Sequence, residues 1–301
     1  MESYSHDKSL KTGKEAAFFN VNSLFSFPAP FLVRLIYPTS ISSHQVIYIS
    51  LVTGVASGYF LSRTEFASTV AGVILLLLKN ILDKADGQLA RARGTASRYG
   101  RFLDSISDFI VNSAVFAGLT WRVYQDFPGV ETLVLGIGAF VFNLLHCSYF
   151  IYYQVSYINL VRPLDLNRVN EAVTEEDIEK LSGTGVGIKT LRLQRVYLWI
   201  YGWQDLLVRI IDTLLYSRIK KRYPDADSLS VWYGNKRFLS LASVLGLGVQ
   251  IGFISVFSLF DRVYIYFWFV CAVMNLYLLF LIAYRYKEAG LTINKCFNDK
   301  D

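Results

Sequence analysis

Charged residues are scarce in this chain, and their scarcity is the first guide to its fold class. Only 18% of the 301 residues are Asp, Glu, Lys or Arg, whereas soluble domains carry about 25%. Hydrophobic residues reach 53% and aromatic residues 16%. This composition excludes disordered, collagen-like and coiled-coil chains, and it indicates a membrane protein with aromatic rings at the lipid–water interface.

Cysteine is also rare, since the only three are Cys147, Cys271 and Cys296, far apart in the sequence. This spacing fits neither a metal cluster nor a disulfide framework. The charged N-terminus is not followed directly by an apolar stretch, so the sequence predicts no signal peptide. The net charge is +6 and the cations flank apolar runs. This favours contact with anionic membrane lipids and argues against nucleic acid as a partner.

Long apolar runs, in contrast, are abundant, and a helix that spans a bilayer needs about 20 mostly apolar residues. Six runs meet or approach this length, at residues 44–62, 65–82, 103–124, 130–158, 238–260 and 262–284. We therefore predict an all-α integral membrane protein with six transmembrane helices. Residues 1–42 would form an N-terminal region, 43–285 the transmembrane domain and 286–301 the tail.

Lys and Arg are distributed unevenly among the connections, and such residues favour the cytoplasmic side. Arg63, Arg122 and Arg262 lie on one side with few other cations, whereas the opposite side holds the cation-rich stretches 83–102 and 160–237. We expect both termini, the 83–102 connection and a helical insert at about 160–237 to be cytoplasmic. The protein would then be a multi-pass protein of an inner or plasma membrane.

Two stretches are predicted to lie on the membrane surface. Residues 16–38 combine aromatic rings with leucines, and Pro28 and Pro30 are expected to bend this amphipathic helix. Within 190–222, apolar residues recur every three or four positions, and the charges between them make a spanning position costly. The residues expected to share its apolar face are Trp199, Trp203, Leu206, Ile210 and Leu214.

Four aspartates gather at the cytoplasmic ends of the second and third predicted spans: Asp83, Asp86, Asp104 and Asp108. Their helical spacing places each pair on one face. Gly94 and Thr95 lie between the pairs and can break the helix. We expect a hairpin that brings the two acidic faces together.

Converging carboxylates beside hydrocarbon need a counter-ion, and oxygen-rich sites suit hard divalent cations such as Mg²⁺, with Mn²⁺ as a second choice. Two such ions could clamp an in-line displacement at phosphorus. Gly87 and Gly100 allow a ligand close to the backbone, and Arg91 offers a planar fork to phosphate. The residues therefore predict a two-metal, diphosphate-cleaving site. The alternative of four ordinary charges at helix ends fits this spacing poorly.

This arrangement resembles the signature of the CDP-alcohol phosphotransferase (CDP-alcohol phosphatidyltransferase) family. The matching pattern is Asp83-x2-Asp86-Gly87-x2-Ala90-Arg91-x8-Gly100-x3-Asp104-x3-Asp108. Members transfer a substituted phosphoryl group from a CDP-linked donor, such as CDP-diacylglycerol, to an alcohol and release CMP. The resemblance implies that two Mg²⁺ ions are held by all four aspartates and that Asp108 is also the general base.

The resemblance also implies a nucleotide pocket and an assembly. The residues that would line the cytidine diphosphate pocket are Gly87, Ala90, Arg91, Ser97 and Gly100. Relatives are commonly homodimers, and the acceptor would be a small alcohol that the sequence does not identify.

Two departures from the family pattern concern the substrates. His44 stands where many relatives carry Asn, and Ile47 replaces the Thr of the same motif. Relatives with phosphorylated acceptors often carry Ser-Tyr-x-Arg-x-Arg after the fourth span. Here Asn159 replaces the first Arg and the second is displaced to Arg162, which argues against a phosphorylated acceptor. The segment 160–237 is nevertheless expected to shape the acceptor pocket, with Arg162 and Arg195 as contacts.

Two other functions remain open, an intramembrane prenyltransferase and a divalent-cation transporter, since both use acidic residues. Prenyltransferases usually separate their two acidic motifs, and a transporter would need carboxylates near the bilayer midplane. Two predictions concern other polar residues. Lys79 is expected to extend toward the interface, and the tyrosines of the fourth span to form an interfacial belt at Tyr149, Tyr152, Tyr153 and Tyr157.

Overall fold

The computed structural model describes residues 17–161, 168, 171–224 and 228–298, and these residues form helices and connections without a strand. Four long helices follow one another: α3 (Ser43–Leu61), α4 (Phe66–Ala92), α5 (Arg98–Asp126) and α6 (Val130–Val161). The insert is helical, with α7 (Glu175–Ser182) and α8 (Gly185–Arg222). The chain then forms α9 (Ser228–Tyr233), α10 (Lys236–Ala242), the 3-10 helix η3 (Ser243–Leu245), α11 (Leu247–Leu259), α12 (Val263–Trp268), the π-helix η4 (Phe269–Met274) and α13 (Asn275–Asn298).

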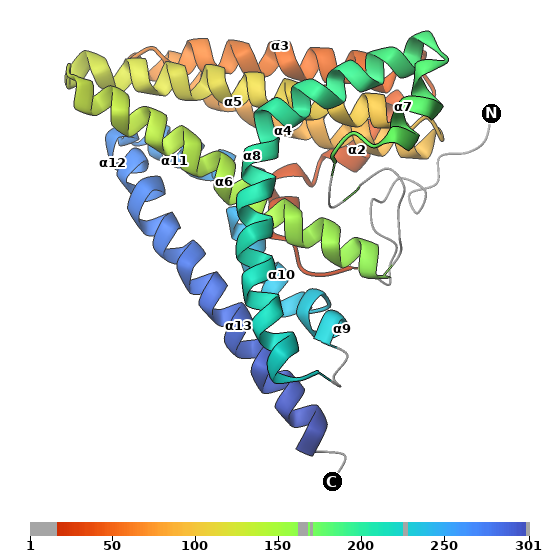
Figure 1. The fold of residues 1–301 in the computed structure, drawn as a ribbon. Helices are drawn as coiled ribbons and strands as arrows, with labels where there is room; N and C mark the ends of the chain where they lie inside the picture. Colours follow the sequence, from red (N-terminus) through yellow and green to blue (C-terminus); the bar gives the residue numbers. More distant parts are fainter. Residues whose placement is uncertain (1–16, 162–167, 169–170, 225–227, 299–301) are drawn as a thin grey trace.

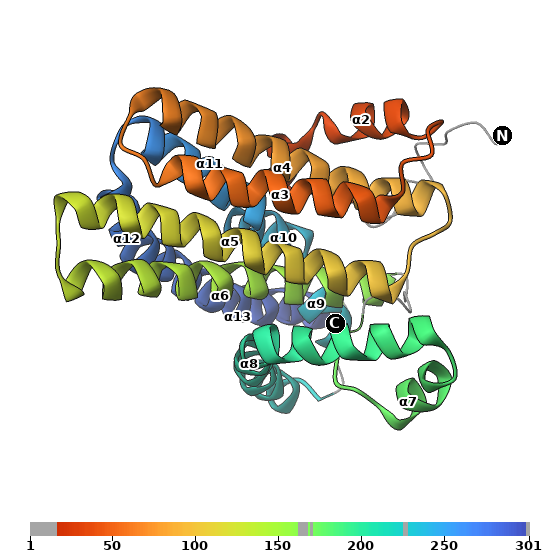
Figure 2. The same cartoon turned by 90° about the horizontal axis from the view of Figure 1, so that it is seen from above.

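The helices fan out from one end of the molecule. Figure 1 shows α3, α4 and α5 running together, while α6 and α13 diverge from them and α8 bends partway along its length. Figure 2 shows the same group from above, with α6 alongside α5. The predicted metal site belongs to the connection between α4 and α5, which lies next to the insert.

Five stretches are long and apolar enough to cross a membrane: Phe66–Ala92, Arg98–Asp126, Val130–Val161, Ser228–Leu259 and Val263–Asn294. They correspond to five of the six predicted spans and support a multi-pass membrane protein. The remaining predicted span is α3, which packs along both α4 and α5. A total of six spans stays a prediction.

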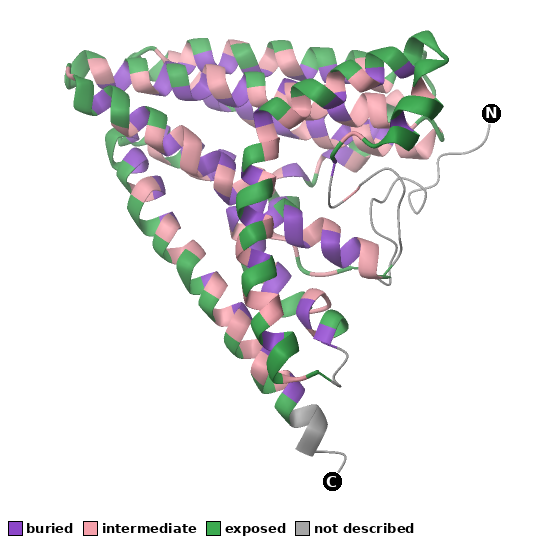
Figure 3. Ribbon diagram, viewed as in Figure 1, coloured by how far each residue is buried: buried purple, intermediate pink, exposed green. Residues whose placement is uncertain are grey.

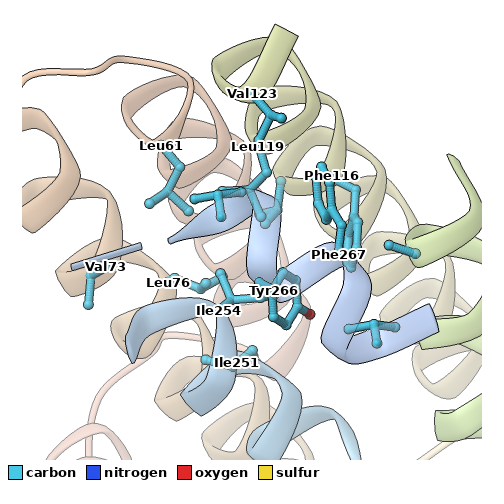
Figure 4. Packing of buried hydrophobic residues seen from close by; sticks show 14 of the residues in the cluster. Leu61, Val73, Leu76, Phe116, Leu119, Val123, Ile251, Ile254, Tyr266 and Phe267 are labelled. Carbon is cyan, nitrogen blue, oxygen red and sulfur yellow. The ribbon is translucent and has the colours of Figure 1, made fainter. Parts of the chain in front are cut away.

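The largest apolar core joins helices from both halves of the chain. Leu61 of α3, Leu119 of α5 and Phe267 of α12 are fully buried there, together with Leu76 and Ile254. Figure 4 shows these side chains converging between the helices. Because α4 and α5 are both anchored in this core, the relative position of their other ends is fixed by packing.

Two glycines allow α3 and α5 to pack backbone to backbone. A Cβ on Gly58 would lie 2.7 Å from the carbonyl group of Ala114, and a Cβ on Gly118 would collide with the carbonyl oxygen of Gly58. No larger residue fits either position without separating the helices. This close contact holds α5 rigidly against α3.

The predicted N-terminal amphipathic helix is not confirmed as one element. The structure has a 3-10 helix, η2 (Val21–Ser26), followed by α2 (Ala29–Ile36), and Pro28 caps α2 between them. Asn22 ties η2 to the second half of the chain, because its Nδ2 donates to the carbonyl oxygen of Ser243 at 2.8 Å. At the other end, Arg93 donates to the carbonyl oxygens of Ile36, Tyr37 and Thr39. The region is therefore fastened to the ends of α4 and η3.

The predicted apolar face of 190–222 is confirmed in α8. Exposed apolar residues follow one side of it, namely Trp199, Trp203, Leu206, Ile210 and Leu214. Gln204 and Asp212 point the other way and are buried. Figure 3 shows this alternation of exposed and buried residues along the helix. α8 thus presents its apolar side outward and its polar side to the protein, as expected for a helix at a membrane interface.

The prediction of an interfacial tyrosine belt on α6 is wrong. Its four residues, Tyr149, Tyr152, Tyr153 and Tyr157, are at most 9% exposed. They are buried because α8 and α10 cover them, with Phe238 packed edge-on against Tyr153 at 5.1 Å between ring centroids. Their hydroxyls are partly satisfied by a buried carboxylate of α8.

That carboxylate, Asp212, is the centre of a polar cluster between α6, α8 and α9. It accepts hydrogen bonds from the hydroxyls of Tyr152 (3.1 Å), Tyr153 (2.8 Å) and Tyr233 (2.6 Å), and from Nε1 of Trp232 (2.8 Å). A buried guanidinium, that of Arg285 on α13, lies 3.9 Å from the ring centroid of Tyr153 and 4.4 Å from that of Trp232. We call these residues the Asp212 cluster.

Candidate active site

The predicted hairpin between α4 and α5 is present. α4 ends at Ala92, and Gly94 adopts a positive φ of 67°, the left-handed conformation that commonly follows a helix end. α5 then begins with Ser97 as its N-cap, whose Oγ accepts a hydrogen bond from the N–H of Gly100 at 3.1 Å. The turn is therefore determined by local sequence, and it brings the two pairs of aspartates to the same end of the helices.

Three of the four predicted metal ligands converge. Carboxylate oxygens of Asp83, Asp104 and Asp108 all lie within 4.8 Å of one another. Such a spacing suits a shared divalent cation, because carboxylate oxygens are the ligands that Mg²⁺ prefers. The prediction that the hairpin joins the acidic faces is correct for these three residues.

Asp86 is buried beside this group but is not one of the three. Its Oδ1 accepts a hydrogen bond from the N–H of Gly87, and its Oδ2 is buried with no hydrogen-bond partner among the described residues. A buried carboxylate oxygen without a donor is costly unless a cation completes its surroundings. The donor set and this orphaned oxygen therefore fit a bound divalent ion.

Lys79 does not extend toward the interface, so that prediction is wrong. Its side chain is buried, and Nζ donates to Oδ1 of Asp83 at 3.2 Å and also to Oδ1 of Asp108. A second ammonium, that of Lys84, lies 3.0 Å from Oδ2 of Asp83 but is partly exposed. Lys79 stays inside because two carboxylates solvate its charge there. The four-residue spacing between Lys79 and Asp83 was the signal in the sequence that could have indicated this pair.

The glycines of the motif make room for the polar groups around them. A Cβ on Gly87 would lie 3.2 Å from Nη1 of Arg91, so the guanidinium lies over the bare backbone at this point. A Cβ on Gly100 would lie 3.4 Å from Nε2 of His44 and 3.5 Å from Oγ of Ser97. His44 is therefore next to the hairpin. That Gly87, Arg91, Ser97 and Gly100 contact a nucleotide stays a prediction, as does the role of the half-buried Ala90.

The insert is attached to the start of α5 by buried ion pairs. Arg98 Nη1 lies 2.6 Å from Oδ1 of Asp177, and Arg101 Nη2 lies 2.7 Å from Oε1 of Glu171. Burial alone would raise the pKa of the Asp177 carboxyl, but hydrogen bonds from Arg98 and Arg168 hold that pKa well below its usual range. The acidic stretch 171–180 is thus a docking segment, a role that sequence reasoning missed although its charge complements the arginines of α5.

α8 continues this contact toward the carboxylates. The hydroxyl of Tyr201 donates to the carbonyl oxygen of Ser105 at 3.0 Å, and Tyr197 packs on Phe102 with ring centroids 5.3 Å apart. Of the two expected acceptor contacts, Arg195 is exposed on α8 and Arg162 lies outside the described residues. Tyr201 is therefore an insert residue that contacts α5 at the position directly after Asp104.

Comparison with known proteins agrees with this geometry. The family model described as CDP-alcohol phosphatidyltransferase matches residues 37–164, from just before α3 to just beyond α6. This range includes all four aspartates and the hairpin.

Three relatives that match part of the chain are each named phosphatidylinositol phosphate synthase. That of Mycobacteroides abscessus is 44% identical over 50 residues, 17% of this chain and 23% of the relative. That of Mycolicibacterium smegmatis is 40% identical over 50 residues, 17% of this chain and 22% of the relative. That of Corynebacterium glutamicum is 24% identical over 103 residues, 34% of this chain and 46% of the relative. The chain thus matches less than half the length of each.

The carboxylate triad, the orphaned oxygen of Asp86 and the capped hairpin all lie within the matched range. They lie on helices apolar enough to cross a membrane. Residues 37–164 therefore match a CDP-alcohol phosphatidyltransferase domain, and the apolar helices support a multi-pass membrane protein.

Proposed function

We propose that this protein transfers a phosphatidyl or other substituted phosphoryl group from a CDP-linked donor, such as CDP-diacylglycerol, to an alcohol and releases CMP, as a step of phospholipid biosynthesis. The observation that carries the proposal is the convergence of Asp83, Asp104 and Asp108 within 4.8 Å, in a domain of matching family. Metal dependence is general in that family. The acceptor stays open, because the named relatives match only part of the chain.

The four aspartates would hold divalent ions, Mg²⁺ or Mn²⁺, with Asp83, Asp86 and Asp104 as ligands and Asp108 as ligand and base. Such ions, when bound, withdraw charge from the phosphoryl oxygens and stabilise the negative charge that develops on the departing CMP. Asp108 would take the proton of the acceptor hydroxyl as the new oxygen–phosphorus bond forms. The bond between that phosphorus and the CMP oxygen breaks in the same displacement, and CMP leaves with the bonding electron pair.

Arg91 would bind the donor diphosphate, because a guanidinium can form two parallel hydrogen bonds to phosphate. Its position over Gly87 supports this role, since a side chain at residue 87 would press on the guanidinium. Ser97 supports the site as the cap of α5, and its hydroxyl oxygen retains a lone pair and a proton for a ligand. We further propose, from the distribution of Lys and Arg, that the site and both termini face the cytoplasm, and from the family that the protein is a homodimer.

The alternative functions are less well supported by the structure. An intramembrane prenyltransferase would also bind a diphosphate, but here both acidic pairs belong to a single hairpin. A cation transporter would leave the arrangement of Gly87 and Arg91 without a purpose. The hairpin therefore favours phosphoryl transfer over both.

The decisive experiment is a CMP-release assay on the purified full chain in detergent. CDP-diacylglycerol and Mg²⁺ are supplied with serine, inositol, inositol phosphate or glycerol phosphate, and the lipid product is identified by mass spectrometry. We expect CMP and one new phospholipid with one of these acceptors and neither product with Asp104→Ala. Equal CMP release by Asp104→Ala, or metal-independent release, would contradict the proposal.

A further inference from the structure

Lys79 occupies the centre of one side of the carboxylate group. It contacts Asp83 and Asp108, two of the three residues whose oxygens lie within 4.8 Å of one another. Its side chain is only 3% exposed. The ammonium of Lys79 therefore occupies the position that a metal ion bound to both Asp83 and Asp108 would take.

The surroundings of Lys79 hold it in this position. A Cβ on Gly54 would lie 2.5 Å from both methyl groups of Val111 and 3.0 Å from Cγ of Lys79, so the missing side chain at residue 54 leaves space for Val111 and the lysine stem together. The hydroxyl of Ser50 donates to the carbonyl oxygen of Lys79 at 3.3 Å, which ties the same turn of α4 to α3. The contact between Lys79 and the carboxylates is thus supported by α3 as well as by charge.

On the other side of the group, Arg91 is the cation whose charge acts on Asp86 and Asp104, and no lysine contacts these two carboxylates among the described residues. Asp104 makes no hydrogen bond or ion pair within the described part of the chain, and Oδ2 of Asp86 is buried without a donor. Lys84 reaches only Asp83, and its side chain is 43% exposed. The carboxylates that are not paired with a lysine are therefore Asp86 and Asp104, whereas Asp83 and Asp108 are paired with Lys79.

We propose that Lys79 is a built-in counter-ion of this site, so that divalent ions bind in two unequal steps. The first ion binds toward Asp86 and Asp104, which are not paired with a lysine and of which Asp86 keeps its Oδ2 without a donor. The second must displace the ammonium of Lys79 from Asp83 and Asp108, and breaking buried ion pairs opposes its binding. This inference rests on the proposed metal-dependent function and assigns to Lys79 the control of metal occupancy.

The test is a titration of the purified full chain with Mn²⁺ alone, followed by electron paramagnetic resonance. Free Mn²⁺ is counted from its six-line signal, and two neighbouring bound ions are detected by their magnetic coupling. For the wild type we expect one tight ion and a second that binds at least about tenfold more weakly, since two buried ion pairs must break. In Lys79→Met the second step should strengthen by at least the same factor.

Two variants serve as controls. Lys84→Met removes a cation that touches only Asp83 from a partly exposed position, so the two steps should remain unequal. Lys79→Arg keeps the positive charge and should also keep them unequal. If Lys79→Met does not fold, as judged by gel filtration in detergent, Lys79→Gln takes its place, because it keeps a hydrogen-bonding group without the charge.

Two results would overturn the inference: equal affinity for both ions in the wild type, or a second step unchanged in the charge-free variant. Either result can occur while CMP release stays metal-dependent, in which case only the role of Lys79 fails. If the wild type binds no Mn²⁺ and CMP release does not depend on metal, the proposed function fails with it.

Discussion

Two of the buried carboxylate clusters in the described part of the chain, the hairpin aspartates and the Asp212 cluster, differ in how completely their carboxylate oxygens are bonded. Asp212 accepts four hydrogen bonds, three from tyrosine hydroxyls and one from Trp232. In the α4–α5 hairpin, Asp86 keeps a buried oxygen without a donor and Asp104 has no ion pair within the described residues. Both oxygens of Asp212 are therefore hydrogen-bonded within the protein, whereas the hairpin carboxylates are not all bonded.

This contrast separates a structural carboxylate from a functional one. Buried polar groups are normally hydrogen-bonded, because an unmade bond costs about 1–3 kcal/mol. The Asp212 carboxylate follows that rule and joins α6, α8 and α9. The hairpin departs from this rule at the place where the protein would receive metal ions and substrate. We therefore expect bound ligands to complete the bonding of its carboxylate oxygens.

The largest effect should follow the loss of a metal ligand. Asp83→Ala, Asp86→Ala and Asp104→Ala should each reduce CMP release to background, because every one removes a proposed ligand from the site. EDTA should do the same to the wild type, and Mg²⁺ or Mn²⁺ should restore activity. The unfolding temperature of the metal-free Asp104→Ala protein should not fall, because Asp104 makes no hydrogen bond or ion pair with another described residue that the substitution would break. A large drop in the unfolding temperature would show that Asp104 stabilises the fold, as Asp212 does.

The next effect concerns Asp108, which should act as base as well as ligand. Asp108→Asn keeps the shape of the side chain and removes its basicity, so turnover should fall by about 10²–10⁴-fold. Binding of the CDP-linked donor should survive, because Asp83, Asp86 and Arg91 remain. Donor affinity can be measured by calorimetry with the inactive variant. If affinity falls together with turnover, Asp108 serves mainly as a ligand and the base lies elsewhere.

Asp212→Ala should lower the stability of the fold and leave the activity of the folded protein nearly unchanged, the reverse of what we expect for the hairpin aspartates. The substitution leaves four buried donors without their acceptor, so the protein should lose about 3–5 kcal/mol of unfolding free energy. The fraction that stays folded should release CMP at nearly the wild-type rate, because Asp212 belongs to the other cluster. Thermal unfolding in detergent, with activity normalised to folded protein, measures both quantities. Glu176→Gln, at an exposed ion pair with Lys180, is the matched control and should change neither. A catalytic defect in folded Asp212→Ala would show that the two clusters are coupled.

The smallest effect should come from the ion pairs of the insert. The pKa of Asp177 is held below its usual range, so its contacts with Arg98 stabilise the folded protein above the ordinary carboxyl pKa of about 3.9 and are lost as pH falls through the lower folded value. Asp177→Asn should therefore lower the unfolding temperature by a few degrees at neutral pH. The difference from the wild type should shrink below about pH 4, where unfolded Asp becomes protonated. If the difference in unfolding temperature between Asp177→Asn and the wild type did not change with pH, the charge of Asp177 would not be the cause of the stabilisation.

The hairpin was predictable from sequence because its determinants are local. The spacing of the aspartates, Gly94 in the turn and the motif glycines all lie within one stretch of α4 and α5. The Asp212 cluster was not predictable, because Tyr153 and Asp212 are 59 residues apart. Tyrosines at helical spacing look the same at an interface and in a core.

Lys79 and the acidic segment of the insert show the same limit. A lysine near the end of a span usually extends toward water. Burial of Lys79 is favourable because Asp108, 29 residues away, adds a second carboxylate to the nearby Asp83. Likewise Arg98 and Asp177 are separated by 79 residues. Sequence therefore indicated which residues carry charge, but the partners of each charge depended on how α5, α7 and α8 pack.

The outward apolar face of α8 has a consequence for how an oily substrate could arrive. Trp199 and Trp203 point away from the protein, while Tyr201, between them in sequence, is bonded to α5 at Ser105. Next to Ser105 in the chain is Asp104. One helix, α8, thus carries an outward apolar face and contacts the residue next to Asp104. A donor with two fatty tails could keep them on the outer side of α8 while only its head group passes the edge of this helix.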